Sequence, residues 1–261
     1  MIQLLNLVAR ATFGMYAWLA FGLLGLVTLV LLLIIPGLNY RRSLAQGCSR
    51  FMLRLVGINC VVRHAEQLPQ APCVIVANHS SYIDGLILKA GLPARFSFVI
   101  KKEMIRVPLA GLLLQRIGSL FVDRSNRHAG GMDARRIMRE ATDGKSLIFF
   151  PEGTFTSRVG LEKFHLGAFV TAQRASLAVV PVVIRGARRV LRPGSIWPRP
   201  GDIEIEVLGV ITGDVEANAG MRDRSIAEAM RDQARARILL ALGEPDLQSE
   251  ATTSAEGQLA R

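Results

Sequence analysis

The chain has 261 residues, of which 50% are hydrophobic and 20% are charged. This length suits one α/β domain with extra elements, and the apolar content excludes a disordered chain. The 32 Lys and Arg residues exceed the 21 Asp and Glu residues and leave a net charge of +11, which predicts a polyanionic partner such as nucleic acid, an anionic membrane or a phosphorylated substrate. The three cysteines form no Cys-x-x-Cys pair, so we expect a reducing compartment and no structural zinc.

An uncharged apolar segment runs from Ala11 to Pro36 near the start of the chain. It is about as long as the ~20 residues that a helix needs to cross a bilayer, and longer than the ~7–15 apolar residues of a signal peptide. Only Arg10 precedes it, whereas four arginines follow it, namely Arg41, Arg42, Arg50 and Arg54. The positive-inside rule therefore predicts an anchor in the inner (cytoplasmic) membrane, with the bulk of the chain on the cytoplasmic face. Glycines within the segment leave a re-entrant hairpin open as an alternative.

The segment from Tyr40 to Ile58 places apolar residues near helical spacing with arginines between them. This pattern fits a helix lying on an anionic membrane surface and equally a helix packed on a soluble domain. We divide the chain into a membrane anchor with an interfacial helix (1–58), an α/β domain (59–243) and a disordered tail (244–261). The tail is assigned because apolar periodicity is lost there.

From Cys73 onward, short apolar runs alternate with amphipathic stretches. The runs are continuously apolar, as expected for strands covered on both faces, so we predict an α/β fold with a mixed, largely parallel sheet and helices on both faces. The predicted strands are 73–77, 96–100, 119–122, 147–150, 178–184 and 203–207, and the predicted helices are 82–90, 108–117, 131–142, 167–175 and 224–242. Pro181 lies inside one of these strands and cannot donate a ladder hydrogen bond, which predicts an edge position or a bulge.

Polar residues follow the first predicted strand in the run Asn78-His79-Ser80-Ser81-Tyr82-Ile83-Asp84. Ligands of α/β sheets gather beyond the carboxyl ends of such strands. If Ser81 caps the following helix, Asp84 falls in the first helical turn and can reach the imidazole of His79. The carboxylate would then fix the ring tautomer and leave the other nitrogen to take a proton. The alternative is that Asp84 only completes a capping box.

Charged residues also follow three other predicted strands. Lys101 and Lys102 follow the second strand and Arg124 follows the third, and each is either a phosphate ligand or a solvated surface charge. The segment Glu152-Gly153-Thr154 follows the fourth. Its glycine allows close approach of the backbone, and its carboxylate either binds substrate hydroxyls or pairs with an arginine.

The blocks NHSSYID, KKEM with GSLFVDR, FPEGT and VVPVVI occur in the order and rough spacing of the four motifs of the glycerolipid acyltransferases. From about Pro69 to Leu208 the chain resembles the bacterial 1-acyl-sn-glycerol-3-phosphate acyltransferases, the lysophosphatidic acid acyltransferase family. The resemblance implies an O-acyltransferase in which His79, oriented by Asp84, deprotonates the free hydroxyl of a lysophospholipid. That oxygen would attack the thioester of acyl-CoA or acyl-carrier protein and give phosphatidic acid. The resemblance further implies that no metal or cofactor is required and that the substrate is bound by Lys101, Arg124, Glu152, Gly153 and Thr154.

One position departs from the family pattern, because many relatives continue FPEGT with Arg-Ser whereas this chain continues with Phe155-Thr156. Arg158 or Arg185 would have to replace that arginine, or the acceptor differs; a lyso-ornithine lipid is the alternative acceptor. The expected partners are the lysophospholipid, the acyl thioester, an anionic membrane surface and, as one of the two donors, acyl-carrier protein. A thioesterase and a non-catalytic basic lipid-binding protein are the rival functions. Nucleic acid is not expected, because only 6% of residues are aromatic and no reader motif is present.

Overall fold

The computed structural model describes residues 2–123, 127–213 and 223–249. Within these residues the centre is a seven-stranded sheet of order β1-β7-β6-β2-β5-β3-β4. The strands are β1 (Ile58–Arg63), β2 (Cys73–Ala77), β3 (Ser97–Lys101), β4 (Leu120–Val122), β5 (Leu147–Phe149), β6 (Ala178–Arg185) and β7 (Gly201–Val207). Strands β2 to β6 run parallel, β7 is antiparallel to β6, and β1 is parallel to β7. The predicted mixed, largely parallel sheet is confirmed.

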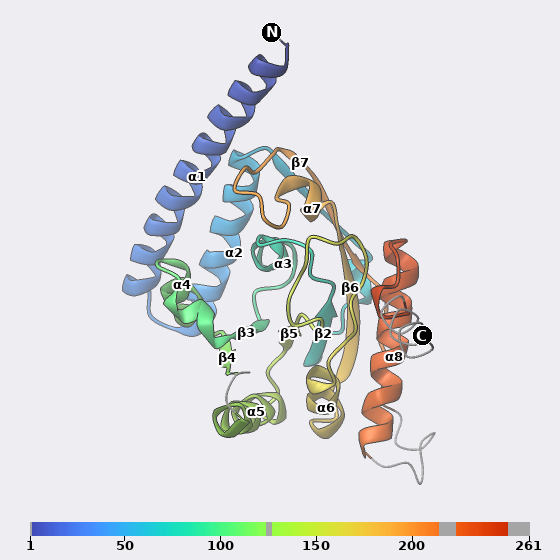
Figure 1. Cartoon of the computed structure of the whole chain (residues 1–261). Coiled ribbons are helices and arrows are strands. Elements are labelled where there is room, and N and C mark those ends of the chain that lie inside the picture. Colours follow the sequence, from blue (N-terminus) through green and yellow to red (C-terminus); the bar gives the residue numbers. More distant parts are fainter. Residues whose placement is uncertain (1, 124–126, 214–222, 250–261) are drawn as a thin grey trace.

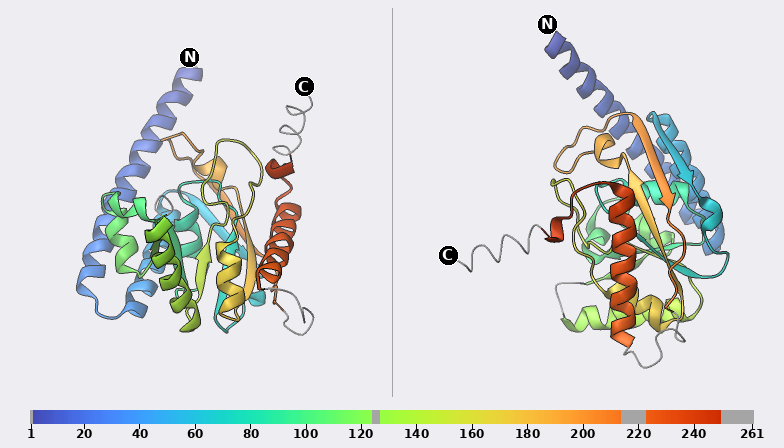
Figure 2. Two further views of the ribbon diagram at one scale, coloured as in Figure 1. Left: turned by 60° about the horizontal axis from the view of Figure 1, so that its bottom comes forward. Right: turned by 90° about the vertical axis from the view of Figure 1, so that its right-hand side faces the viewer.

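Helices cover both faces of this sheet (Figures 1 and 2). One face carries α1 (Ile2–Ile34), α2 (Leu38–Leu55), α3 (Asp84–Gly91) and α7 (Ala187–Val190), and the other carries α6 (Gly167–Arg174) and α8 (Asp223–Leu242). Helix α5 (Arg127–Thr142) covers β3 and β4, while α4 (Ala110–Arg116) and the 3₁₀ turns η1 (Ala65–Gln67) and η2 (Lys102–Arg106) complete the described elements. In β2, Ile75 packs into one core and Val74 and Val76 into the other. Burial on both faces explains why these strands are apolar at every position.

Helix α1 packs against the protein along most of its length. The Tyr16 hydroxyl donates a hydrogen bond to the Leu55 carbonyl at 2.9 Å, and the Arg116 guanidinium donates one to the Leu33 carbonyl at 3.2 Å. These contacts are separated by roughly 25 Å along the helix axis. The segment Leu7–Ile34 is long and apolar enough to cross a membrane, yet 33% of its apolar window is buried in protein. Helix α1 is therefore part of the fold and not a separate tether.

Helix α2 packs on the α/β domain, so the second of the two interpretations of this segment holds. Arg42 is 6% exposed and donates hydrogen bonds to the carbonyls of Ile117 and Arg95, both at 3.0 Å. Burial lowers the pKa of Arg42, and its charge is compensated by these carbonyl dipoles. Arg50 donates to the Ala90 carbonyl at 2.7 Å. These two arginines bind protein carbonyls, and a role for them on a membrane surface is not needed to explain them.

Two features of the sheet differ from the sequence prediction. Strand β1 has no predicted counterpart, because it is an edge strand whose buried and exposed residues alternate and lacks the continuous apolar run of the inner strands. The edge position predicted for Pro181 is wrong, since β6 lies between β7 and β2. The β6–β7 ladder covers only residues 182–185 of β6, and the Leu208 N–H donates to the Pro181 carbonyl at 2.9 Å. Pro181 pairs with Val76 of β2 but lies just beyond the segment paired with β7, where its missing N–H costs little.

Residues 244–249, predicted as the start of a disordered tail, are folded onto the domain. Arg235 forms an ion pair with Asp246 at 2.5 Å, and its hydrogen bond lowers the pKa of Asp246 to about 2. Leu247 is 3% exposed. The burial of Leu247 and the Arg235–Asp246 ion pair are tertiary contacts, and the local pattern of apolar residues does not predict them. The rest of the predicted tail, 250–261, lies outside the described residues.

Candidate active site

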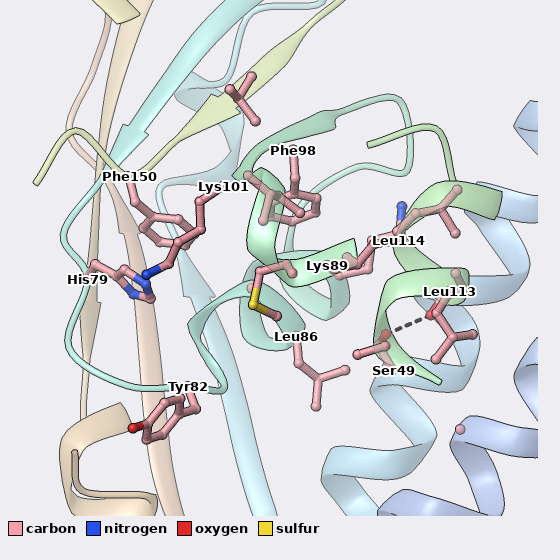
Figure 3. Close-up of a pocket in the computed structure, with 18 of the residues that line it drawn as sticks. Ser49, His79, Tyr82, Leu86, Lys89, Phe98, Lys101, Leu113, Leu114 and Phe150 are labelled. Carbon is pink, nitrogen blue, oxygen red and sulfur yellow. Dashed lines mark hydrogen bonds between the residues drawn. The ribbon is translucent and has the colours of Figure 1, made fainter. Parts of the chain in front are cut away.

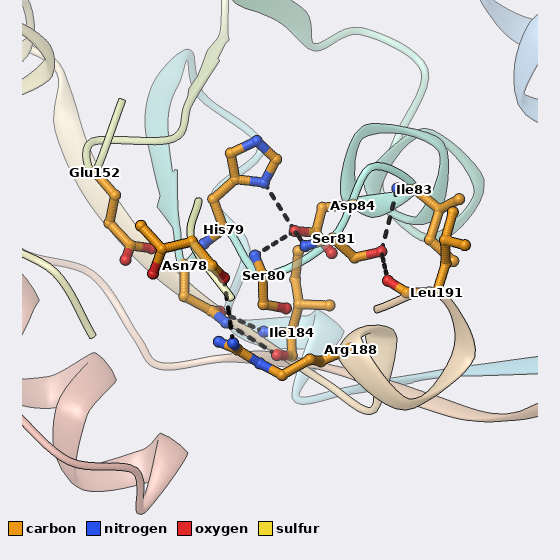
Figure 4. Close-up of polar contacts among 11 residues, drawn as sticks. Asn78, His79, Ser80, Ser81, Ile83, Asp84, Glu152, Ile184, Arg188 and Leu191 are labelled. Carbon is orange, nitrogen blue, oxygen red and sulfur yellow. Dashed lines mark hydrogen bonds and ion pairs between the residues drawn. The ribbon is translucent and has the colours of Figure 1, made fainter. Parts of the chain in front are cut away.

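The predicted site residues that the structure describes lie together at the carboxyl ends of the parallel strands. His79 follows β2, Lys101 ends β3, and Glu152 follows β5. Asp84 is the first residue of α3, which begins after the β2 loop. Figure 4 shows His79, Asp84 and Glu152 together, although Glu152 comes 73 residues after His79 in the chain. The fold thus collects side chains from separate motifs at one edge.

The His79 ring is bound by Asp84. Nδ1 of His79 lies 2.8 Å from Oδ2 of Asp84, and the same oxygen accepts the N–H groups of Ser80 at 2.6 Å and Ser81 at 2.8 Å. Asp84 is fully buried. Because an ionised carboxylate only accepts hydrogen bonds, the ring donates through Nδ1 and leaves Nε2 to take a proton. The contact predicted from the spacing is confirmed, whereas the catalytic role of the pair stays a prediction.

The start of α3 differs from the prediction. The helix begins at Asp84, so Ser81 is not its N-cap. The Ser81 hydroxyl instead donates to the carbonyl of Leu191 at 2.7 Å, in the segment that follows α7. The same hydroxyl also accepts the Ile83 N–H at 3.4 Å, and Asp84 accepts the Ser81 N–H, which is the reciprocal contact of a capping box. The Ser81 hydroxyl thus joins a local contact to a tertiary acceptor 110 residues away.

Asn78 fixes the point at which the histidine loop leaves the sheet. Its side-chain amide donates to the Ile184 carbonyl at 3.0 Å, and the Ile184 N–H donates to the Asn78 amide oxygen at 2.7 Å. Both residues are buried. The side chain therefore continues the β2–β6 hydrogen bonding past the end of β2, and the sequence does not predict this role.

Glu152 supports the same loop from the other side. Its carboxylate accepts the backbone N–H of His79 at 2.6 Å and that of Glu162 at 3.0 Å. Glu152 is 6% exposed, and burial raises its pKa to about 7 although the two N–H groups oppose the rise. Neither of the sequence interpretations, a substrate hydroxyl or an arginine partner, describes this contact. In the structure Glu152 positions the backbone of His79.

Aromatic side chains enclose the imidazole. The Phe150 ring stacks on His79 with centroids 4.3 Å apart, and Phe155 packs edge-on at 4.5 Å. Tyr82 in turn packs edge-on against Phe155 at 4.8 Å. The sequence motifs do not predict this enclosure, although Phe155 is the position at which the chain departs from the family motif. The rings restrict the access of water to the histidine.

A cavity of about 570 Å³ extends from His79 toward α1, α2 and α4 (Figure 3). Its volume is within the range of small-molecule pockets, and its walls are mostly apolar. Lys101, Gly153 and Thr154 line it together with His79. Figure 3 shows the Lys101 side chain running toward His79. This arrangement places a cation, a histidine base and an apolar channel side by side.

The other predicted cations have different positions. Lys102 pairs with Asp123 at 3.5 Å. Arg185 forms ion pairs with Glu204 and Glu206, both at 2.7 Å, so it does not replace the missing motif arginine. Arg124 lies outside the described residues. In the part of the chain that the structure describes, no group of three or more His, Cys, Asp and Glu residues could hold a metal ion.

Comparisons with known proteins agree with this arrangement. The acyltransferase family model matches residues 59–185. A 1-acyl-sn-glycerol-3-phosphate acyltransferase from Limnanthes alba is 30% identical over 189 residues, which cover 71% of this chain and 67% of that protein. A lyso-ornithine lipid O-acyltransferase from Pseudomonas aeruginosa is 36% identical over 148 residues, which cover 55% of this chain and 54% of that protein.

A solved structure has the same fold. The crystal structure of PlsC, the 1-acyl-sn-glycerophosphate acyltransferase from Thermotoga maritima, superposes with a TM-score of 0.68 at 18% identity and covers 90% of this chain and 96% of that one. Several curated relatives are longer than the matched region. The chain spans only about half the length of some of them, with 58% and 54% in two cases.

Proposed function

The chain belongs to the 1-acyl-sn-glycerol-3-phosphate acyltransferase family, and on this premise we propose that it transfers an acyl chain from an acyl thioester to the free hydroxyl of 1-acyl-sn-glycerol-3-phosphate, giving phosphatidic acid. The observation that carries the proposal is the His79–Asp84 pair, whose open ring nitrogen lies at the mouth of an apolar cavity. A lipid-binding protein needs the cavity but has no need for an oriented imidazole. The acyl donor is the thioester of CoA or of acyl-carrier protein.

In the proposed reaction His79 acts as a general base. Nε2 removes the proton from the acceptor hydroxyl while the hydroxyl oxygen attacks the thioester carbonyl. The tetrahedral intermediate collapses, the carbon–sulfur bond breaks, and the thiolate takes the proton back from the imidazolium. Asp84 stabilises the imidazolium through the Nδ1 hydrogen bond. No covalent acyl-enzyme forms, and no metal or cofactor is required for the proton balance.

We propose that the acceptor phosphate binds at Lys101. Its ammonium group extends toward His79 from the end of β3 (Figure 3). Gly153, with φ of +78°, turns the chain beside the same cavity and offers backbone at close approach. Thr154 is exposed on the rim. Glu152 acts on the acceptor indirectly, because its carboxylate is engaged by the backbone of His79.

A lyso-ornithine lipid is the second candidate acceptor, and the residue at position 155 favours it. Phe155 stands where many relatives have arginine, so the mouth of the site lacks a cation at this position. Tyr82 is 64% exposed and packs against Phe155, so a pair of aromatic rings is offered to a cationic headgroup. The 36% identity to the Pseudomonas lyso-ornithine lipid enzyme supports the same alternative.

We propose that α1 holds the protein in one leaflet of the membrane. Its outward side chains are apolar and exposed, with Leu19 at 74%, Leu23 at 65% and Ile34 at 72%. Because α2 and α4 pack along the helix, a perpendicular crossing would draw those elements into the hydrocarbon core. The inner membrane and its cytoplasmic face remain predictions from the positive-inside rule.

The test uses the purified full-length protein with lysophosphatidic acid and with lyso-ornithine lipid, each supplied with acyl-CoA and with acyl-carrier protein. Mass spectrometry identifies the product, and we expect phosphatidic acid. His79→Ala should lower transfer by about 10²–10⁴-fold, the usual contribution of a general base. His64→Asn is the matched control, since His64 is half-exposed and pairs with Glu66 away from the cavity.

Three results would contradict the proposal. Undiminished transfer by His79→Ala would remove the general base. Release of free fatty acid in the presence of saturating lysolipid would indicate a thioesterase. Lipid binding without turnover of either donor would indicate a non-catalytic lipid-binding protein.

A further inference from the structure

Lys89 is a buried charged residue that the proposed reaction does not use. It lies on α3, is 7% exposed and lines the same cavity as His79. Figure 3 shows its side chain directed toward α4 near Leu114, whereas Lys101 is directed toward His79. Among the described residues Lys89 has no hydrogen-bond or ion-pair partner.

The surroundings of Lys89 make an unpartnered amine costly. Burial, and to a lesser extent the charge of Arg42, lower the pKa of Lys89 to about 8. The amine is therefore still mostly protonated at neutral pH, with three N–H donors and no acceptor. The cavity hydroxyls of Ser49 and Thr28 donate to carbonyls of their own helices, at 2.7 Å and 2.6 Å, and neither is hydrogen-bonded to Lys89. Among the described residues no group accepts a hydrogen bond from the ammonium, so its partner is water or a bound ligand in the cavity.

The cavity limits what that occupant can be. Beyond His79 its walls are formed by apolar residues of α1, α2, α3 and α4, such as Leu32, Met52, Leu86 and Leu113. A free anion would have to give up its hydration between these apolar walls, whereas a polar group on an apolar chain enters with the burial of that chain. A group that reaches Lys89 must therefore be carried on an apolar chain. A neutral oxygen on an otherwise apolar chain satisfies both conditions.

We propose that the cavity takes an acyl chain bearing a hydroxyl substituent, and that Lys89 binds this hydroxyl. The inference rests on the proposed function, since the thioester carbonyl has to lie at His79 for transfer. With the carbonyl held there, the distance to Lys89 selects one position of the hydroxyl along the chain. An unsubstituted chain dehydrates the ammonium and offers no acceptor in return.

The experiment measures binding, so that it does not depend on turnover. The full-length His79→Ala protein in detergent is titrated with stearoyl-CoA and with hydroxystearoyl-CoA isomers whose hydroxyl moves stepwise along the chain, without acceptor. We expect one isomer to bind about ten-fold or more tightly than stearoyl-CoA, as expected when a buried donor gains its partner. Lys89→Met, added to the same background, should abolish this preference, and Lys89→Gln should keep part of it.

Leu86→Met is the matched control, because Leu86 lies on the same helix and lines the same cavity without a charge. It should keep the preference of the parent protein. Equal binding of all isomers by the parent, or a preference that survives in Lys89→Met, would overturn the proposal. This binding result is independent of the proposed acyl transfer, which is contradicted if the wild-type protein acylates no lysolipid. Position-dependent binding would then still show the Lys89 site.

Discussion

At the scale of single residues, two carboxylates act on different parts of His79. Asp84 binds the ring through Nδ1, and Glu152 binds the backbone N–H of the same residue. Phe150 and Phe155 pack on the ring from two sides. The imidazole thus has little freedom to rotate, and its open nitrogen is directed by the loop and not by the substrate. Such preorganisation lowers the entropic cost of reaching the reactive geometry.

Asp84→Asn tests the role of the ring contact. The amide can still accept loop N–H groups, but it cannot stabilise an imidazolium and favours the wrong tautomer. We expect kcat to fall by about 10²–10⁴-fold while KM for the thioester changes little. Steady-state kinetics on both substrates measure this, with the exposed Asp232→Asn as the control. An unchanged kcat would mean that Asp84 only braces the loop.

Glu152→Gln tests the buried carboxylate through pH. The pKa of Glu152 is raised from 4.5 to about 7, so the folded protein binds this proton more tightly than the unfolded chain. Its stabilising contribution is present below about pH 4.5 and is lost as the pH rises to about 7. The variant lacks this loss and should gain stability relative to the wild type over that window, by on the order of 3 kcal/mol at most.

Unfolding midpoints of both proteins across this pH range measure the difference. The glutamine also changes the hydrogen bonds to His79 and Glu162, but that effect is independent of pH. A difference in stability that stays constant from acid to neutral pH would contradict the raised pKa.

At the scale of elements, α2 is attached to the domain by an arginine whose charge is buried. Arg42 reaches the end of α4 and the start of β3, binding the Ile117 and Arg95 carbonyls and the Ser97 hydroxyl. Helix α2 also contributes Leu53 to the main apolar core. Helix α2, whose sequence pattern also fits a helix on a membrane surface, is therefore a structural part of the α/β domain.

Arg42→Met should lower the free energy of unfolding by roughly 3 kcal/mol, because it leaves buried carbonyls without donors. Thermal melts in detergent measure the loss. Arg54→Met removes the same charge from an exposed position of the same helix and should leave the melting temperature nearly unchanged. If both variants melt like the wild type and both bind anionic vesicles more weakly, α2 is an interfacial helix after all.

At the scale of the whole molecule, α1 has two faces with different surroundings. Gly25, Thr28 and Leu32 line the cavity, whereas Leu19 and Leu23 point outward and are exposed. The same helix thus closes one side of the cavity and carries an exposed apolar surface. If α1 lies in a membrane leaflet as proposed, an acyl chain would pass from the membrane toward His79 without crossing water.

Deleting the chain through Ile34 should abolish transfer even with detergent-dispersed substrates, because the cavity loses a wall. Replacing Leu19 and Leu23 by Gln should instead weaken vesicle binding while keeping activity in detergent. Vesicle co-sedimentation and a detergent assay separate the two effects. Full activity of the truncated chain in detergent would show that α1 is only an anchor.

The sequence by itself determined the motifs of this protein and most of its inner strands and helices. The continuously apolar run of Cys73–Ala77 predicts a strand buried on both faces, and β2 has those bounds. The five-residue spacing of His79 and Asp84 predicts their contact, since both ends of that contact lie in one loop and one helical turn. Such features depend on neighbours within about ten residues, which is the range over which periodicity and capping act.

Only the tertiary structure decided how these elements meet. The strand order that puts Pro181 inside the sheet, the contact of Glu152 with the His79 N–H and the burial of Arg42 all join distant parts of the chain. The position of Lys89 in the cavity also depends on distant parts of the chain, because the sequence of α3 does not show that α1, α2 and α4 enclose this side chain. Tertiary packing, and not the local sequence pattern, sets which face of each helix is covered and which charged side chain is buried.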